Sequence, residues 1–188
     1  MSFAAYANHA GVDCQGVPVE NHAFAGTNGN NTITGTSGQD IINALGGDDT
    51  VYGKGGNDII CGAGGRDTLY GENGNDAIFG GADADDIWLG PDNDTGSLGG
   101  DGNDAMHGSD GADVFEGQGG KDTLTGGQGR EDIRGQDGED NLYGDEGDND
   151  ALFGHADVDF LNGGPGSSDD CDAGPPSGDD ADNANCEP

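Results

Sequence analysis

The stretch GKGGNDIICGAGGRDTLYGENGNDAIFG, which runs from Gly53 to Gly80, decides the fold. Divided into nines, it reads GKGGNDIIC, GAGGRDTLY and GENGNDAIF, with Gly80 opening the next unit. Each unit begins with Gly and has Gly again at its fourth place, Asp at its sixth and an aliphatic residue at its eighth. A fixed short period of this kind predicts a stack of identical structural units.

The composition alone argues against an ordinary folded domain. Only 30% of the 188 residues are hydrophobic, 41 are Gly, and 38 acidic residues face five basic ones, for a net charge of −33. Low hydrophobicity with high net charge is typical of disorder, and self-repulsion opposes a compact state. The net negative charge also excludes nucleic acid as a partner, since the chain would repel its phosphate groups. The regular repeat favours order, provided that cations supply positive charge.

The nine-residue pattern continues over residues 26–171 as sixteen units, of which 89–98 and 144–153 carry one extra residue. Gly at the first and fourth places predicts a tight turn, and one apolar residue among polar ones predicts a short strand with a single inward side chain. Two units form one coil of eighteen residues. We therefore expect an all-β roll of about eight coils, with two parallel sheets joined by two rows of turns. The inward side chains are Ile33, Ile42, Val51, Ile60, Leu69, Ile78, Ile87, Met106, Phe115, Leu124, Ile133, Leu142, Leu152 and Leu161.

The sixth place of each unit predicts a metal site, because carboxylates stacked one coil apart repel each other unless a cation lies between them. Ca²⁺ accepts about six to eight oxygens and mixes carboxylates with backbone carbonyls, whereas Mg²⁺ fits such a cage poorly. About a dozen Ca²⁺ ions would bring roughly +24 and nearly cancel the negative charge. Asn31 and Glu131 replace Asp, and Ser168 breaks the column. The predicted ligands are Asp40, Asp49, Asp58, Asp67, Asp76, Asp85, Asp94, Asp104, Asp113, Asp122, Asp140, Asp150 and Asp159.

The units GKGGNDIIC, GAGGRDTLY, GQGGKDTLT and GQDGEDNLY resemble the RTX nonapeptide, also called the haemolysin-type calcium-binding repeat. The resemblance implies a right-handed parallel β-roll that is disordered without calcium and folds as it binds. It also implies that the Asp of each turn is a ligand, with turn carbonyls completing the shell. The chain departs from the pattern where Asp83, Asp92 and Asp157 replace the fourth-place Gly, at Pro91, and at Gly96, which stands where an apolar residue is expected.

The outward ninth places of alternate units predict an aromatic ladder of Tyr52, Tyr70 and Trp88 on one outer face, with Cys61 and Phe79 on the opposite face. Two interpretations stay open. The rings either pack across strands or under a terminal segment, or they form a flat binding strip for carbohydrate or a protein partner.

Residues outside the repeat suggest two flanking regions. Residues 1–25 are expected to form an N-terminal cap, residues 26–171 the roll, and residues 172–188 an acidic tail closed by a disulfide. The four cysteines allow three pairings, of which Cys14 with Cys61 and Cys171 with Cys186 fits this arrangement. An even number of cysteines in a chain poor in core favours an oxidising compartment.

The pattern favours a non-enzymatic role. The sequence shows no pairing of a nucleophile with a general base and no zinc motif. It also shows no secretory signal and no stretch long enough to span a membrane. The first hypothesis is an extracellular calcium-binding protein that folds on binding Ca²⁺ and acts as a structural scaffold or secretion-linked module. The alternative is an adhesion protein or a decoration of a virion or cell surface, which binds its partner through the caps or the aromatic ladder.

Overall fold

The computed structural model describes residues 23–174 and residue 186, and its regular structure over those residues is entirely β-strand. Seventeen strands form two parallel sheets, in agreement with the predicted all-β roll. The nine-stranded sheet contains β1 (Ala23–Thr27), β3 (Ile41–Leu45), β5 (Ile59–Gly64), β7 (Ala77–Ala82), β9 (Thr95–Asp101), β11 (Val114–Gly119), β13 (Asp132–Asp137), β15 (Ala151–His155) and β17 (Asp170–Asp172). The eight-stranded sheet contains β2 (Thr32–Thr34), β4 (Thr50–Gly55), β6 (Thr68–Asn73), β8 (Asp86–Trp88), β10 (Ala105–Gly111), β12 (Thr123–Gly129), β14 (Asn141–Gly147) and β16 (Phe160–Asn162).

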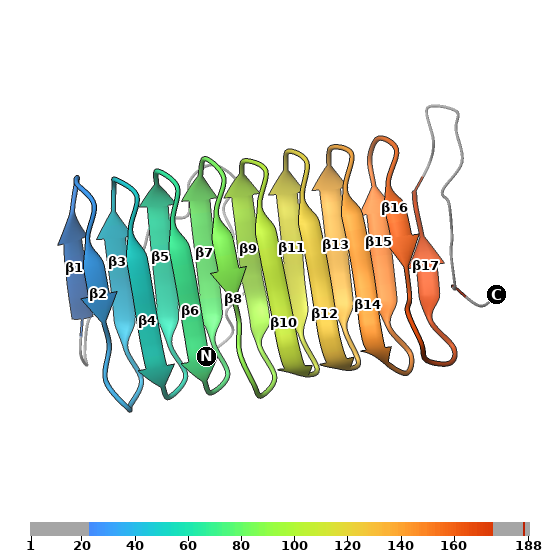
Figure 1. Cartoon of the computed structure of the whole chain (residues 1–188), viewed down its shortest axis with the longest axis horizontal. Coiled ribbons are helices and arrows are strands. Elements are labelled where there is room, and N and C mark those ends of the chain that lie inside the picture. Colours follow the sequence, from blue (N-terminus) through green and yellow to red (C-terminus); the bar gives the residue numbers. More distant parts are fainter. Residues whose placement is uncertain (1–22, 175–185, 187–188) are drawn as a thin grey trace.

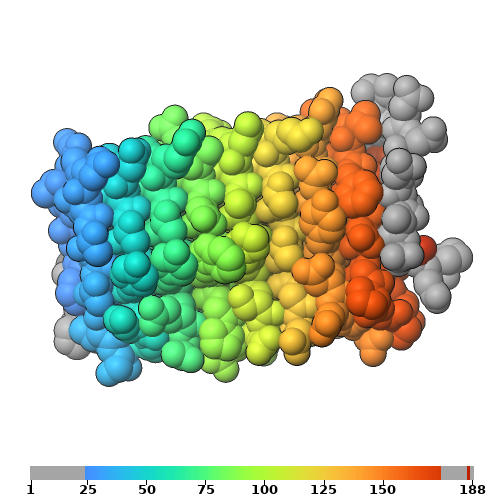
Figure 2. All heavy atoms as spheres, viewed as in Figure 1, coloured from blue at the N-terminus to red at the C-terminus, as the bar shows by residue number. Residues whose placement is uncertain are grey.

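The chain alternates between the two sheets, so each strand pairs with the strands two positions before and after it. The pairing register follows the expected eighteen-residue coil, as in Ile42 opposite Ile60 and Tyr52 opposite Tyr70. Odd-numbered and even-numbered strands run in opposite directions, and turns at both edges join them (Figure 1). Successive coils follow one another as adjacent bands along the long axis (Figure 2). The repeat therefore sets both the topology and the register.

The core is a single file of side chains from each sheet, because alternate residues of a strand point to opposite faces. The predicted inward residues from Ile42 to Leu161 are fully buried, and Ile33 at the N-terminal end is partly buried. Ala44 and Leu89, which replace the first-place Gly of their units, join this core. A core one side chain thick on each sheet leaves the turns to contribute much of what holds neighbouring coils together.

The ten-residue unit 89–98 is accommodated by a shift in strand register. Counting in nines puts Gly96 at the inward place, and that assignment is wrong. Ser97 is the fully buried residue there, and its Oγ accepts a hydrogen bond of 3.0 Å from the Ile78 amide. The register between β9 and β11 shifts beside it, and Phe115 lies opposite Ser97. A small residue next to the largest buried side chain keeps the volume of this layer close to that of its neighbours.

Two predictions on the flanking regions concern mainly residues outside those that the structure describes. The expected cap at 1–25 lies outside them up to residue 22, and the expected tail lies outside them at 175–185 and 187–188. Within the described part, no helix is long and apolar enough to cross a membrane.

Candidate metal centre

Every predicted Asp ligand is buried inside a turn, although Asp is among the residues that are rarely buried without a partner. The turns form two rows, one at each edge of the sheets, because consecutive units alternate between the edges. The turns of one row carry Asp40, Asp58, Asp76, Asp94, Asp113, Glu131 and Asp150, and those of the other carry Asn31, Asp49, Asp67, Asp85, Asp104, Asp122, Asp140 and Asp159. The side chains with carboxylates in these rows are at most 3% exposed.

From Asp49 onward, one carboxylate oxygen of each Asp in these rows links neighbouring coils. The backbone amide of Asp58 donates a hydrogen bond of 2.7 Å to Oδ1 of Asp76, and the Asp76 amide donates one of 2.6 Å to Oδ1 of Asp94. The second row repeats this arrangement, for example from the Asp49 amide to Asp67 Oδ1 at 2.8 Å. The backbone carbonyls of these residues accept sheet hydrogen bonds, as from the Ala77 amide to the Asp58 carbonyl at 2.9 Å. Only the second carboxylate oxygen is then left over.

That second oxygen is buried and lacks a hydrogen-bond partner in turn after turn. A buried oxygen without a partner is destabilising by about 1–3 kcal/mol, and by more when it is charged. One or two such groups are common in a protein of this size, but a periodic series requires a single explanation. The Oδ2 atoms concerned belong to Asp49, Asp58, Asp67, Asp76, Asp85, Asp94, Asp104, Asp113, Asp122, Asp140, Asp150 and Asp159.

In all units except those that begin with Ala44 and Leu89, a first-place Gly leaves the space into which this oxygen points. A Cβ built on Gly53 would lie 2.6 Å from Asp58 Oδ2 and 2.7 Å from the carbonyl oxygen of Gly71, one coil further on. In the other row, a Cβ on Gly99 would lie 2.5 Å from Asp104 Oδ2. An unpartnered carboxylate oxygen and a carbonyl oxygen of the next coil thus converge on one point, which the first-place Gly leaves open in these turns.

The pKa values of these carboxyl groups also show that the ionised form is disfavoured inside the turns. Burial raises the pKa of Asp76 to about 7 and those of Asp85 and Asp94 to about 8. The hydrogen bond from the preceding coil opposes the rise, whereas the charges of neighbouring carboxylates in the same row add to it. At neutral pH, a carboxyl group buried in this way needs a positive charge beside it to be stable in its ionised form.

The available donors fit a hard divalent cation. Carboxylate and carbonyl oxygens are the ligands of Ca²⁺, which tolerates irregular shells of about six to eight oxygens. Over residues 23–174 and 186, no group of three or more His, Cys, Asp or Glu side chains gathers as a ready-made metal site. A cation between two coils would therefore take one carboxylate per turn and draw the greater part of its shell from backbone carbonyls. This is the arrangement expected from the sequence, and its ligand set stays a prediction.

Two positions in the rows differ from the plain Asp pattern. Glu131 is 1% exposed, both of its carboxylate oxygens lack a partner, and burial raises its pKa to about 9. Its backbone amide donates a hydrogen bond of 3.1 Å to Asp150 Oδ1, so the backbone keeps the link to the next coil while the longer side chain accepts no hydrogen bond. Asn31 is partly buried and carries no charge, and its backbone amide donates a hydrogen bond of 2.6 Å to Asp49 Oδ1.

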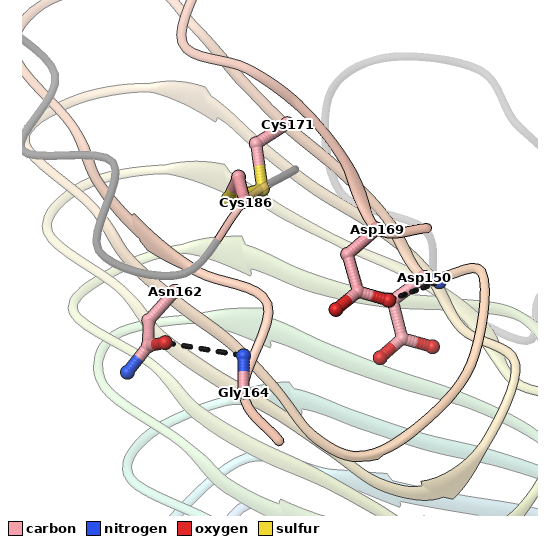
Figure 3. Close-up of a disulfide and its surroundings, with 6 residues drawn as sticks. All are labelled: Asp150, Asn162, Gly164, Asp169, Cys171 and Cys186. Carbon is pink, nitrogen blue, oxygen red and sulfur yellow. Dashed lines mark hydrogen bonds between the residues drawn. A yellow bond between two sulfur atoms is a disulfide. The ribbon is translucent and has the colours of Figure 1, made fainter. Parts of the chain in front are cut away.

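Asp169 is a member of the first row that counting in nines misses. The expectation that Ser168 breaks the column is wrong, because Asp169 is 2% exposed and its Oδ1 accepts a hydrogen bond of 3.1 Å from the Asp150 amide (Figure 3). The last turn contains one extra residue, and Ser168 takes a φ of 70° as Asn149 takes 69° in the other long turn. The signal was present in the sequence, since GDEGDND and GGPGSSD both place Asp seventh.

The predicted disulfide between Cys171 and Cys186 is confirmed. Cys171 lies on β17 at the last coil, and the bond joins it to Cys186 with the two Cα atoms 5.9 Å apart (Figure 3). The other predicted pair, Cys14 with Cys61, involves a residue outside those described, and it stays a prediction. Cys61 itself is buried on β5 and lies opposite Phe79, as the eighteen-residue spacing indicates.

The predicted aromatic ladder forms on the eight-stranded sheet and is one ring longer than expected. Tyr52 and Tyr70 stack with centroids 5.1 Å apart, Tyr70 and Trp88 with centroids 6.4 Å apart, and Trp88 and His107 with centroids 4.0 Å apart. His107 was missed because the ten-residue unit delays it by one place. Each ring covers the face of its neighbour, so the ladder stabilises adjacent strands and presents ring edges to solvent. A partner for this face stays a prediction.

A comparison with protein-family sequence models agrees with this geometry. The family described as RTX calcium-binding nonapeptide repeat (4 copies) matches residues 25–60, 62–95, 98–130, 125–150 and 134–168. The matched segments cover nearly all of the repeat region and both rows of turns. No curated protein matches the chain.

Proposed function

The chain belongs to the RTX calcium-binding nonapeptide-repeat family, and on this premise we propose that it is an extracellular structural protein whose roll becomes ordered as Ca²⁺ binds between its coils. The observation that carries the proposal is the periodic series of buried Oδ2 atoms without partners. A roll with those oxygens ionised and uncompensated would be strongly destabilised. With a cation beside each of these oxygens, the same carboxylates would instead link neighbouring coils and stabilise the roll.

The energetic logic couples binding to folding. The unfolded chain holds its 38 acidic side chains in water and far apart on average, so it offers no preformed site. Only the roll brings one carboxylate and several carbonyls together, and therefore the free energy of binding becomes free energy of folding. The residues that would hold the ions are the sixth-place Asp side chains and the neighbouring turn carbonyls. When bound, the cation supplies positive charge beside carboxylates that the fold holds inside the turns.

The repeats and the disulfide support the proposed compartment. Repeats of this family are typical of secreted proteins. The disulfide between Cys171 and Cys186 is of a kind that persists in oxidising surroundings and is rare in a reducing cytosol. Both observations support an extracellular role as a scaffold or secretion-linked module. The buried carboxylates are accounted for as ligands, which favours a structural role over a catalytic one.

The proposal is tested by far-ultraviolet circular dichroism during a calcium titration. The metal-stripped chain at neutral pH is expected to give a largely disordered spectrum and to gain strand signal cooperatively with Ca²⁺. Excess EDTA should reverse the change, and an equal concentration of Mg²⁺ should not reproduce it, since Mg²⁺ retains its waters and a tight octahedron. A strand spectrum that excess EDTA leaves unchanged would contradict the proposal.

A further inference from the structure

The second place of each turn separates the turns into two conformational classes. In fourteen of the sixteen units this residue lies in the left-handed region, with φ between 67° at Asp145 and 124° at Gly127. The two exceptions are Thr27 and Thr36, which open the first two units and lie outside that region. The fourteen left-handed residues are Leu45, Lys54, Ala63, Glu72, Gly81, Gly90, Gly100, Ser109, Gln118, Gly127, Gln136, Asp145, His155 and Gly164.

The chemistry of Thr explains the exception. A β-branched residue is strongly disfavoured at positive φ, whereas Gly, Ala, Ser and unbranched polar side chains occupy that region elsewhere in the roll. With the left-handed conformation excluded, the amide of Thr36 turns toward the carboxylate of its own turn. It donates a hydrogen bond of 2.5 Å to Asp40 Oδ2.

The Thr36 hydroxyl completes the closure. Its Oγ1 lies 3.1 Å from both carboxylate oxygens of Asp40, and it accepts a hydrogen bond of 3.2 Å from the Gly38 amide. The oxygen that is left without a partner in the later turns therefore accepts the Thr36 amide here and lies within hydrogen-bond distance of the Thr36 hydroxyl. Asp58, one coil further along the same row, shows the contrast, because its Oδ2 is buried without a partner.

The first unit repeats this closure with a neutral side chain. The Thr27 amide donates to Asn31 Oδ1 at 2.6 Å, and Asn31 Nδ2 donates to Thr27 Oγ1 at 3.2 Å. Asn in place of Asp removes the charge that a cation would balance. Two consecutive turns, one in each row, thus satisfy their side-chain oxygens from within.

We propose that a Thr at the second place closes a turn against cations, so that the first two turns of this chain are held by hydrogen bonds and the calcium-binding series begins with the third. Turns with a Thr at the second place are called closed turns, and turns with a left-handed residue at the second place are called open turns. The inference rests on the proposed function, since it concerns which turns share in calcium binding. It gives the roll a first coil whose turns do not depend on a cation.

The test compares four forms of the full chain in saturating calcium: wild type, Thr36→Ala, Thr36→Val and Thr27→Ala. Bound calcium per chain is measured by equilibrium dialysis with elemental analysis, at a precision that resolves one ion in roughly a dozen. Exchange of the residue 36 amide with deuterium is measured on the same samples, and circular dichroism confirms the fold of each.

Thr36→Ala is expected to bind one ion more than wild type and to lose protection of the residue 36 amide, because Ala63 shows that Ala accepts the left-handed conformation. Thr36→Val keeps the branched Cβ and should retain both the wild-type stoichiometry and the protected amide. Thr27→Ala should gain no ion, since Asn31 offers no carboxylate.

Unchanged stoichiometry in Thr36→Ala, or loss of its fold in saturating calcium, would overturn the inference and leave calcium binding by the open turns intact. An extra ion in Thr36→Val would refute the role of the branched side chain, and one in Thr27→Ala would refute the need for a carboxylate. A wild-type chain that binds no calcium would instead overturn the proposed function itself.

Discussion

The closed turns at residues 26–40 and the open turns that follow them are built from the same nine-residue pattern, yet they treat the buried oxygen in opposite ways. In GTSGQD the carboxylate of Asp40 receives the amide and hydroxyl of Thr36. In GKGGND the corresponding Oδ2 of Asp58 has no donor, although the first-place Gly leaves the same space beside the carboxylate in both turns. One side chain at the second place therefore changes how a turn balances the same acid.

The comparison teaches that sharing a repeat motif and sharing a binding site are separate properties. Both kinds of turn place an Asp or Asn at the end of the loop, and both link to the next coil through the same amide-to-Oδ1 hydrogen bond, as at Asp40 to Asp58 and Asp58 to Asp76. They differ in the backbone conformation of the second-place residue and in what satisfies the remaining oxygen. Three experiments sharpen this difference, beginning with the largest expected effect.

Acidification of the metal-free protein should restore order in the open turns. The pKa of Asp76 is raised from 3.8 to about 7, and those of Asp85 and Asp94 are raised to about 8, chiefly by burial. Between pH 4 and 8, roughly, the folded state then binds more protons than the unfolded state, so its stability increases as the pH falls. We expect strand signal in EDTA to rise from pH 8 to pH 5.

The control for this experiment is the calcium-loaded protein, in which the pH dependence should have the opposite sign because protons compete with the cation for the same carboxylates. Metal-free samples that lose strand signal on acidification would show that the buried carboxylates do not govern the stability of the open turns.

The second experiment compares Asp76→Asn in an open turn with Asp40→Asn in a closed turn of the same row. Asn keeps the Oδ1 acceptor and removes the charge. In calcium, Asp76→Asn should lower the free energy of unfolding by about 3–5 kcal/mol, as expected when one partner of a buried ion pair is removed. Asp40→Asn should change it by about 1 kcal/mol or less, because Asn31 already makes the equivalent contacts with Thr27.

Denaturant unfolding in calcium measures both effects, and the strand signal by circular dichroism in EDTA supplies a further check. Without the cation, Asp76→Asn should stabilise the roll, since it removes an uncompensated buried charge. Equal losses for the two variants in calcium would mean that the two kinds of turn do not differ in their dependence on the cation.

The third and smallest effect concerns the shape of one open turn. Gly53→Ala would put a methyl group within 2.6 Å of Asp58 Oδ2 and 2.7 Å of the Gly71 carbonyl, and should destabilise the calcium-bound protein by about 1–3 kcal/mol. Gly55→Ala is the matched control, because its nearest neighbour would be the Asn73 carbonyl at 3.6 Å. The control should be neutral or stabilising by about 0.5 kcal/mol. Isothermal calorimetry with Ca²⁺ should show weaker binding for Gly53→Ala alone, and equal behaviour of the two variants would argue against a cation beside Gly53.

Much of this arrangement could be predicted from the residues in order. The two sheets, the eighteen-residue register, the inward aliphatic file and the start of the aromatic ladder all follow from a nine-residue period, because alternate side chains of a strand point to opposite faces and equivalent positions of stacked coils lie side by side. The predictions went wrong at Gly96 and Ser168, where an extra residue breaks the count. There the roll keeps its buried positions filled, by Ser97 in one case and Asp169 in the other, and moves the surplus residue into a bulge or a left-handed turn position.

The amino-acid sequence by itself determined that a polyanion with one apolar residue in nine would form a roll and would need positive charge at every turn. Only the tertiary structure decided which turns need it. Whether a carboxylate oxygen has a donor depends on the backbone angle of a residue four places earlier and on a coil eighteen residues away. Those relations exist only after the chain has closed on itself, and so Thr36 and Lys54 occupy the same place in the repeat but lie in turns of opposite character.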